Sequence, residues 1–277
     1  MRIDSHQHFW SYNATDYVWM TEAHQPLRRD FLPADLHPLL DRAGIDGTIA
    51  VQARQMIRET EWLVSLAEED PRILGVVGWL PLSEPTLPDL LAEWAERPKI
   101  VGFRHVVHDE PDPDFILRPD FNRGVSALAK YGCCYDILIF ARHLPQTLRF
   151  ADMHEDLTLI VDHIAKPAIR RAVFDQPWAD GIRELARRPH VHCKLSGMMT
   201  EVHDPAWDID TMRPYVDTIL EAFGPGRIMF GSDWPVSLLG GQYQHWVDTV
   251  AALISPLSQT EQEAIMGGTA ARCYLGR

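Results

Sequence analysis

The sequence predicts an α/β protein with the architecture of a (β/α)8 barrel. Eight short apolar segments alternate with helical segments, and one strand–helix unit takes about 30 residues. Most of the apolar segments are nearly continuous, as in parallel strands that helices cover. The first strand is not followed by a Gly-rich phosphate loop, which disfavours an open nucleotide-binding sheet. Because no linker or low-complexity tract divides the chain, we expect one domain over residues 1–277.

Four strands are predicted in the first half of the chain, at residues 2–8, 47–52, 73–79 and 99–104. The helices expected between them cover residues 33–43, 57–69 and about 87–94, with apolar residues three or four apart. In the first helix Leu36, Leu39 and Leu40 have this spacing, and Gly44 can end it. Residues 9–32 form an aromatic-rich loop, and loops of this length are usually functional.

Four more strands are predicted in the second half, at residues 133–140, 157–163, 191–195 and 227–233. The expected helices are residues 120–130, 144–153, 178–187, a helix ending near residue 223, 242–254 and 259–273. A Pro/Asp-rich segment at 105–119 and a polar segment at 196–207 have the composition of irregular loops.

The composition excludes several classes of partner. The net charge is −13, which disfavours nucleic acid and acidic membrane surfaces. The sequence contains no run of about 18 apolar residues, so we expect no membrane span. Its first residues lack the apolar core of a signal peptide, and we therefore expect a cytoplasmic protein.

Polar side chains gather where the predicted strands end. In a barrel these ends share one face, which is where active sites of this fold lie. His6 and His8 are two residues apart on a strand and so point to the same side. The other candidates are Gln52, Arg54, Arg104, His105, His163, Lys166, Lys194 and Asp233. The histidine pair suits a metal ion, a proton relay or an anion.

Each candidate also has an ordinary structural explanation. The two early histidines can be polar residues at a loop edge, and His163 can be a core histidine bonded to backbone. Lys194 in an apolar strand must reach either a polar pocket or a salt bridge. Lys166 can be plain surface, while Trp234 can form a wall of the pocket or fill the core. Convergence of many polar strand ends at one mouth favours a functional site.

Three motifs carry a family resemblance. His6-Gln7-His8, Asp162-His163 and Gly231-Ser232-Asp233-Trp234-Pro235 close the first, sixth and eighth strands, and together they resemble the amidohydrolase superfamily. The opening Asp4-Ser5-His6-Gln7-His8-Phe9-Trp10 is most similar to its lactonase and decarboxylase branch, within it the L-fuconolactonase and L-rhamnonolactonase group. The resemblance covers about residues 2–275. It implies a barrel of the amidohydrolase type.

The resemblance also implies a metal position, at His6, His8, His163 and Asp233. Fuller metal centres of the superfamily take a Lys or Glu from strand four and a histidine from strand five. Here strand four offers Arg104, which cannot ligate, and strand five has no histidine. A two-metal centre is therefore not expected. We expect no strictly required cofactor, with one zinc ion at these four residues as the alternative.

The implied reaction is hydrolysis of a sugar lactone, such as L-fucono-lactone, to the aldonic acid in sugar catabolism. Asp233 is the expected general base and acid, supported by the catalytic histidines His6, His8 and His163. The expected substrate-binding residues are Gln52, Arg54, Arg104, Lys194 and Trp234. The expected partner is a small sugar lactone, and a homo-oligomer stays open.

Two other functions are compatible with the same residues. One is a zinc-dependent decarboxylase of an aromatic or muconate-like acid, or a lactonase of a dicarboxylate, for which Arg54 and Arg104 leave room. The other is a non-catalytic sugar-binding barrel. Asp233 separates the last from an enzyme, because binding alone does not require a base at that position.

Overall fold

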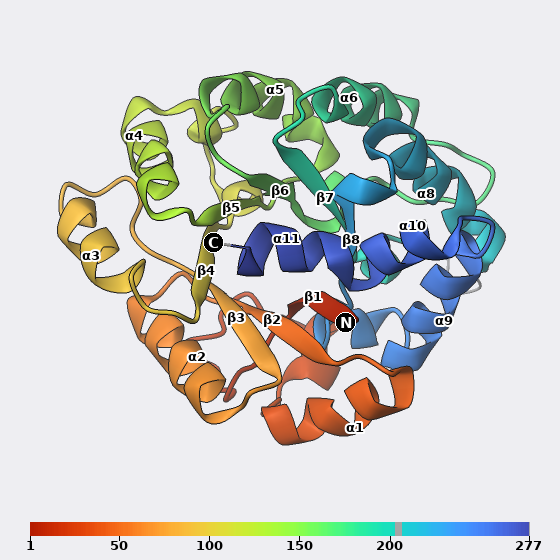
Figure 1. Cartoon of the computed structure of the whole chain (residues 1–277), viewed down its shortest axis with the longest axis horizontal. Helices are drawn as coiled ribbons and strands as arrows, with labels where there is room; N and C mark the ends of the chain where they lie inside the picture. The colour runs from red at the N-terminus through yellow and green to blue at the C-terminus, as the bar shows by residue number, and fades with distance from the viewer. Residues whose placement is uncertain (203–206, 277) are drawn as a thin grey trace.

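Eight parallel strands form one sheet in sequence order in the computed structural model, which describes residues 1–202 and 207–276. The strands are β1 Ile3–Gln7, β2 Gly47–Val51, β3 Ile73–Gly78, β4 Ile100–His105, β5 Cys134–Ile137, β6 Leu159–Val161, β7 Val191–Leu195 and β8 Ile228–Phe230. A parallel bridge between Gln7 of β1 and Trp234, four residues after β8, joins the two edges of the sheet. The predicted (β/α)8 barrel is confirmed, and Figure 1 shows it end-on.

Helices surround the sheet on the outside (Figure 1). The longer ones are α1 Pro33–Ala43, α2 Ile57–Glu69, α3 Leu87–Trp94, α4 Pro119–Leu128, α5 Leu144–Met153, α6 Gln176–Ala186, α8 Ile209–Phe223 and α9 Tyr243–Ile254. Their apolar faces bury Leu, Ile, Val and aromatic side chains against the strands. Among the described residues, no helix has both the length and the apolar character that crossing a membrane requires.

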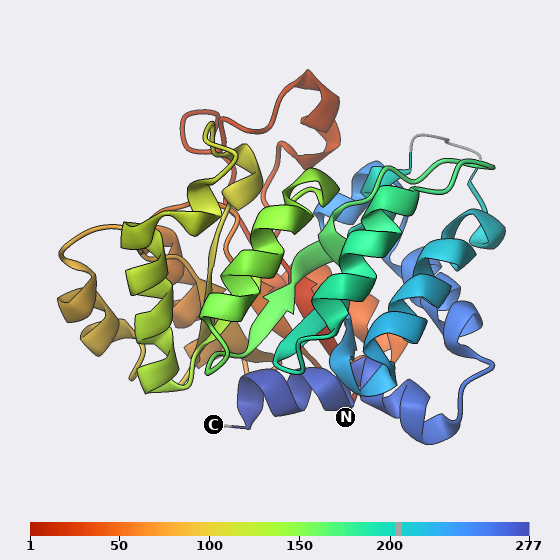
Figure 2. The same ribbon diagram turned by 90° about the horizontal axis from the view of Figure 1, so that it is seen from above.

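The two ends of the barrel are built differently. At one end the helix α11, Thr269–Leu275, lies across the opening next to both termini (Figure 2). Its Ala270 and Tyr274 pack on apolar residues inside the barrel, among them Ile3 and Met229, and so close this end. Two short segments, α10 Gln259–Glu263 and a π-helical turn Ala264–Gly268, precede α11 where one continuous helix was expected.

Long loops stand at the opposite end (Figure 2). The loop 9–32 contains a 3-10 helix, Glu22–Leu27, and Trp10 at its start holds the two ends of the loop together. The indole N–H of Trp10 donates to the carbonyls of Leu27 and Arg29 at 3.2 and 2.9 Å. The predicted loop 196–207 contains a short helix, α7 Met198–Glu201, and its residues 203–206 lie outside the described part of the chain.

Three strands end two or three residues earlier than expected. The predictions 133–140, 157–163 and 227–233 correspond to β5, β6 and β8, which end three residues earlier at Ile137, two earlier at Val161 and three earlier at Phe230. The backbone leaves the ladder there for irregular turns, and both His163 and Asp233 have positive φ, which no strand allows. These departures release polar side chains from the sheet and turn them toward the mouth.

Candidate active site

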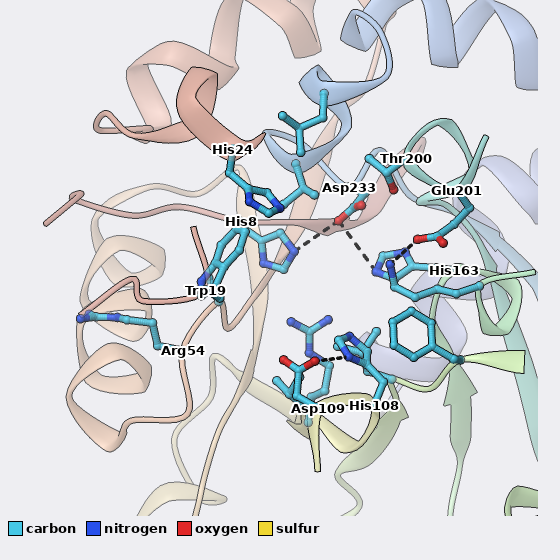
Figure 3. A pocket seen from close by; sticks show the side chains of 18 of the residues that line it. His8, Trp19, His24, Arg54, His108, Asp109, His163, Thr200, Glu201 and Asp233 are labelled. Carbon is cyan, nitrogen blue, oxygen red and sulfur yellow. Dashed lines mark hydrogen bonds and ion pairs between the residues drawn. The ribbon is translucent and has the colours of Figure 1, made fainter. Parts of the chain in front are cut away.

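A cavity of about 860 Å³ opens among the loops that follow the strands. Its wall includes six residues that the sequence pointed to: His8, Arg54, Arg104, His163, Lys166 and Asp233. Figure 3 shows His8 and His163 on either side of Asp233, and both face its carboxylate. Residues from the first, second, fourth, sixth and eighth strand ends therefore converge on one space, as the barrel topology predicts.

The Asp233 carboxylate is the point on which the histidines converge. Its Oδ1 lies 3.4 Å from His8 Nε2, 3.8 Å from His6 Nε2 and 3.8 Å from His163 Nε2. The side chain is 3% exposed, although it forms part of the cavity wall. The backbone N–H of Asp233 donates to the His6 carbonyl at 2.8 Å, which fixes the eighth strand end against the first.

Hydrogen bonds behind two of the imidazoles set their orientation. His8 Nδ1 lies 2.7 Å from the Val51 carbonyl oxygen, which only accepts, so Nδ1 carries a proton and donates it to this oxygen. His163 Nδ1 lies 2.9 Å from Ser196 Oγ. Each ring is therefore anchored on the Nδ1 side and presents Nε2 to Asp233.

An unusual turn delivers His163. Residues His163, Ile164, Ala165 and Lys166 all have φ between 48° and 63°, a left-handed conformation that costs about 1–2 kcal/mol for each residue. Strain of this size persists only where the surroundings determine the backbone fully. The turn directs His163 to Asp233 and Lys166 to the cavity, where Lys166 Nζ donates to Glu201 at 2.6 Å.

The surroundings keep Asp233 ionised and two of the imidazoles neutral. Burial acts to raise the pKa of Asp233, but its interactions with His163, His8 and Lys166 hold it below the usual 3.8. Burial lowers the pKa of His6 and of His163 well below the usual 6.5. Near pH 7 the Asp233 carboxylate therefore faces neutral His6 and His163.

A buried ionic network lies beneath these groups. Arg104 Nη1 donates to Asp162 Oδ2 at 2.9 Å, and Nη2 donates to the Gln52 carbonyl. Lys194 Nζ contacts Asp136, Asp162 Oδ1 at 3.0 Å and His6 Nδ1 at 3.0 Å. The two carboxylates balance the two cations, so the desolvated charges are compensated.

Comparison with known proteins shows to which family this chain belongs. The family model for amidohydrolases matches residues 3–275. The chain belongs to the amidohydrolase family. It is therefore a hydrolase, and the predicted resemblance is confirmed.

Curated relatives of this amidohydrolase include two lactonases. An L-fucono-1,5-lactonase of Burkholderia multivorans is 45% identical over 290 residues, covering 99% of this chain and 96% of that protein. An L-fucono-1,5-lactonase of Burkholderia ambifaria is 38% identical, covering 87% of this chain and 83% of that protein. A crystal structure of an amidohydrolase from Burkholderia multivorans with bound zinc superposes with a TM-score of 0.95 at 45% identity and covers 99% of both chains.

Three expected substrate contacts of this amidohydrolase, Gln52, Lys194 and Trp234, do not line the cavity. Lys194 and Gln52 are fully buried, the first beneath His6 and the second with its amide 3.4 Å from the Arg104 carbonyl. Trp234 points away from the mouth and packs between Phe9 and Phe31. Arg54 does line the cavity, but Asp16 and Glu59 bind its guanidinium.

Most of the remaining polar wall comes from loops, and the sequence assigned none of these residues a role. These residues are Asp16, Trp19, His24, Gln55, His108, Asp109, Thr200, Glu201 and Trp207. The only sequence signal was indirect: the segments 9–32, 105–119 and 196–207 were expected to be irregular loops at the mouth. Lys166, identified as a strand-end candidate, also lines the cavity.

The donor set resembles a metal site in position but not in its electrostatic surroundings. Ligand atoms of His6, His163 and Asp233 lie within 4.8 Å of one another. The two nitrogens of His6 each lie beside a cation, with the Lys194 ammonium 3.0 Å from Nδ1 and the Arg104 guanidinium 3.3 Å from Nε2. Because like charges repel, these residues, as they are arranged here, do not fit a divalent ion at His6.

Proposed function

We propose that the chain hydrolyses an aldono-1,5-lactone of the L-fucono type to the aldonic acid, with Asp233 as the base. The observation that carries the proposal is an ionised, nearly buried carboxylate in the wall of an 860 Å³ cavity, flanked by two anchored imidazoles. The similarity to two L-fucono-1,5-lactonases, at 45% and 38% identity, supports the sugar and the ring size. We expect the reaction to serve cytoplasmic sugar catabolism.

The geometry accounts for each step of lactone hydrolysis. Asp233 accepts a proton from water as the water oxygen attacks the lactone carbonyl carbon. The carbonyl oxygen then carries negative charge, which the fixed Arg104 guanidinium at the cavity wall stabilises. When the ring C–O bond breaks, the proton on Asp233 passes to the ring oxygen. The hydroxy acid leaves, and the carboxylate is restored.

The cavity charges favour a neutral polyol over a dicarboxylate. Each Arg or Lys side chain in the described wall already has a carboxylate partner: Arg54 has Asp16 and Glu59, Arg104 has Asp162, and Lys166 has Glu201. A substrate with two carboxylates would therefore find none of these three cations without a carboxylate partner of its own. Sugar hydroxyls, by contrast, can both donate and accept, and they match a wall that contains Asp109, His108 and Thr200.

A lactone panel tests this proposal. Acid release from 1,5- and 1,4-aldonolactones is followed with a pH indicator, with and without a chelator, beside a dicarboxylate lactone. We expect the L-fucono and L-rhamnono 1,5-lactones to be hydrolysed fastest and the chelator to have little effect. Chelator-sensitive CO₂ release from an aromatic acid, without acid release from any lactone, would establish the decarboxylase alternative instead.

A further inference from the structure

One side of the cavity wall, close to Asp233, is apolar. Met199, Trp207, Val236 and Leu239 follow β7 and β8 in the chain, and all four line the cavity. Leu239 is 37% exposed, so much of its apolar side chain has no protein atoms covering it. These four side chains form what we call the apolar subsite.

A short helix connects two residues of the apolar subsite to Asp233. The 3-10 helix Val236–Leu239 begins three residues after Asp233. Inside it, the backbone N–H of Ser237 donates to the Asp233 carbonyl oxygen at 2.8 Å. Val236 and Leu239 are therefore held close to the base.

Packing at Gly240 adds the other two residues of the apolar subsite. A Cβ built on Gly240 would lie 2.2 Å from the Met199 carbonyl oxygen, so the absence of a side chain permits this close approach. The indole N–H of Trp207 donates to the Gly240 carbonyl at 3.4 Å, and the ring stacks on His245 with 4.8 Å between ring centres. The segments after β7 and β8 thus form one packed surface.

The reaction geometry directs one part of a lactone to this surface. Arg104 belongs to β4 and Asp233 follows β8, and these strands lie on opposite sides of the barrel (Figure 1). When the carbonyl oxygen points to Arg104, the ring oxygen on the same carbon lies toward Asp233, from which it receives its proton. In a 1,5-lactone C5 is bonded to this ring oxygen. The substituent on C5 therefore lies beside the residues that surround Asp233 on the β8 side.

We propose that the apolar subsite binds the C5 substituent of the lactone and selects a methyl group over a hydroxymethyl group. The proposal rests on the proposed function and narrows its substrate class to 6-deoxy-aldono-1,5-lactones. A methyl group gains contact with Val236 and Leu239 and loses no hydrogen bond. A hydroxymethyl group would give up hydrogen bonds to water and find no polar partner among these side chains.

Three freshly prepared lactones that differ only at C5 test the preference. The L-fucono-, L-galactono- and D-arabinono-1,5-lactones carry a methyl group, a hydroxymethyl group and a hydrogen atom there. We expect kcat/KM for the L-fucono lactone to exceed that for the D-arabinono lactone by about three- to fivefold, since one more methyl group is buried. It should exceed that for the L-galactono lactone by about tenfold or more. An equal or larger kcat/KM for the L-galactono lactone would overturn the proposal.

Substitutions in the apolar subsite test which residues select the methyl group. Val236→Thr keeps the branched shape and adds a hydroxyl, and Leu239→Asn adds an amide. We expect each to lower the ratio of kcat/KM between the L-fucono and L-galactono lactones by roughly three- to tenfold. Val106→Thr is the matched control, because Val106 also lines the cavity but follows β4 on the opposite side. It should leave the ratio unchanged.

An unchanged ratio in both Val236→Thr and Leu239→Asn, or an equal decrease in Val106→Thr, would refute the role of the apolar subsite. Circular dichroism and thermal unfolding establish that the variants are folded.

A binding measurement separates this proposal from the proposed reaction. 1,5-Anhydro-L-fucitol and 1,5-anhydro-L-galactitol have the same rings and C5 substituents as the lactones but no carbonyl group, so they cannot be hydrolysed. In titration calorimetry we expect the fucitol to bind about tenfold more tightly. Equal or tighter binding of the galactitol would overturn the subsite, whereas a retained preference without hydrolysis of any lactone would refute the reaction alone. Binding of neither analogue, with no lactone hydrolysed, would refute both.

Discussion

At the residue scale, Asp233 differs from the other acids of the cavity in what surrounds it. Burial works against its charge, yet the neighbouring histidines and Lys166 keep its pKa below the usual 3.8. Asp109 also lines the cavity, but it pairs with His108 and its side chain is 65% exposed. Only the first of these carboxylates is enclosed by anchored imidazoles, which is why it is assigned the proton transfer.

Replacing the Asp233 carboxylate should greatly lower kcat and leave KM nearly unchanged. In Asp233→Asn we expect kcat to fall by roughly 10²–10⁴-fold with KM nearly unchanged, because general base catalysis contributes about that much. Steady-state kinetics on L-fucono-1,5-lactone provides the measurement. Asp109→Asn, the same chemical change in the same cavity, should alter KM by less than about tenfold. Comparable losses of kcat in both variants would contradict the assignment of the base.

At the scale of elements, the left-handed turn after β6 depends on a glycine in the neighbouring loop. Gly197 has φ +65°, and a Cβ built on it would lie 2.5 Å from His163 Nδ1. Here the absence of a side chain serves a close approach as well as a backbone conformation. Gly224, at the end of α8, has φ +67° but nothing within 4 Å of such a Cβ.

Alanine substitutions at these two glycines distinguish the loss of stability caused by backbone strain from the loss of activity caused by a displaced site residue. Gly197→Ala should displace the His163 ring and lower kcat by about tenfold or more, since a misplacement near the chemistry is costly. Gly224→Ala should lose about 1–3 kcal/mol of stability, because φ 67° and ψ 156° are strained for any residue with a Cβ, and it should keep its kcat. Thermal unfolding and initial rates on both variants provide the comparison. If Gly197→Ala shows only the stability loss, His163 does not need its observed position.

The position of the loop 9–32 also depends on a residue that follows a strand, Arg54 just after β2. Arg54 Nη1 donates to Asp16 of this loop at 2.6 Å, and its guanidinium lies 4.6 Å from the centre of the Tyr17 ring. Glu59 accepts from Arg54 Nε at 3.2 Å and is fully buried. The expected substrate contact is therefore also the residue that fastens the loop over the mouth.

Removing the contacts between Arg54 and the loop should weaken substrate binding more than it slows the chemical step. In Arg54→Met we expect KM to increase by roughly tenfold, kcat to change less, and loop 9–32 to become more sensitive to limited proteolysis. Arg58→Met is the control. Arg58 also reaches Asp16, at 3.0 Å, but its side chain is 67% exposed, so its contribution should be small. Equal effects of the two substitutions would argue against a specific role of Arg54.

At the scale of the whole molecule, buried acids make stability depend on pH. Burial raises the pKa of Asp4 to about 6, although Ser232, His6 and Tyr243 donate to it. Unfolded Asp4 has the ordinary value of 3.8, so between these values the folded state holds the proton more tightly. Its contribution to stability is complete below 3.8 and is lost as the pH increases through about 6.

Asp4→Asn should remove this dependence, because an amide does not ionise. Relative to the unaltered protein, the variant should gain on the order of 2 kcal/mol between pH 4 and pH 7, or roughly 4–8 °C in Tm. Thermal unfolding of both proteins across that range gives the difference. A Tm difference that stays constant with pH would show that Asp4 titrates normally in the folded state.

The sequence by itself determined the barrel and the centre of its site. Parallel strands leave their carboxyl ends at one face, so His6, His8, His163 and Asp233 had to meet there once their strands were identified. The alternation of apolar strands and amphipathic helices is a local property, and local periodicity is what a sequence displays directly.

Tertiary structure decided which polar side chains reach the substrate space. A strand position gives the face of a side chain but neither its depth nor the neighbours that compensate its charge, and so Lys194 ended in a buried ion network beneath His6. Positive φ at the strand end turned Asp233 inward, while Trp234 packed outward on Phe9 and Phe31. The loop residues of the wall, such as Glu201 and Asp109, are placed by contacts between segments distant in sequence, and no local pattern encodes those contacts.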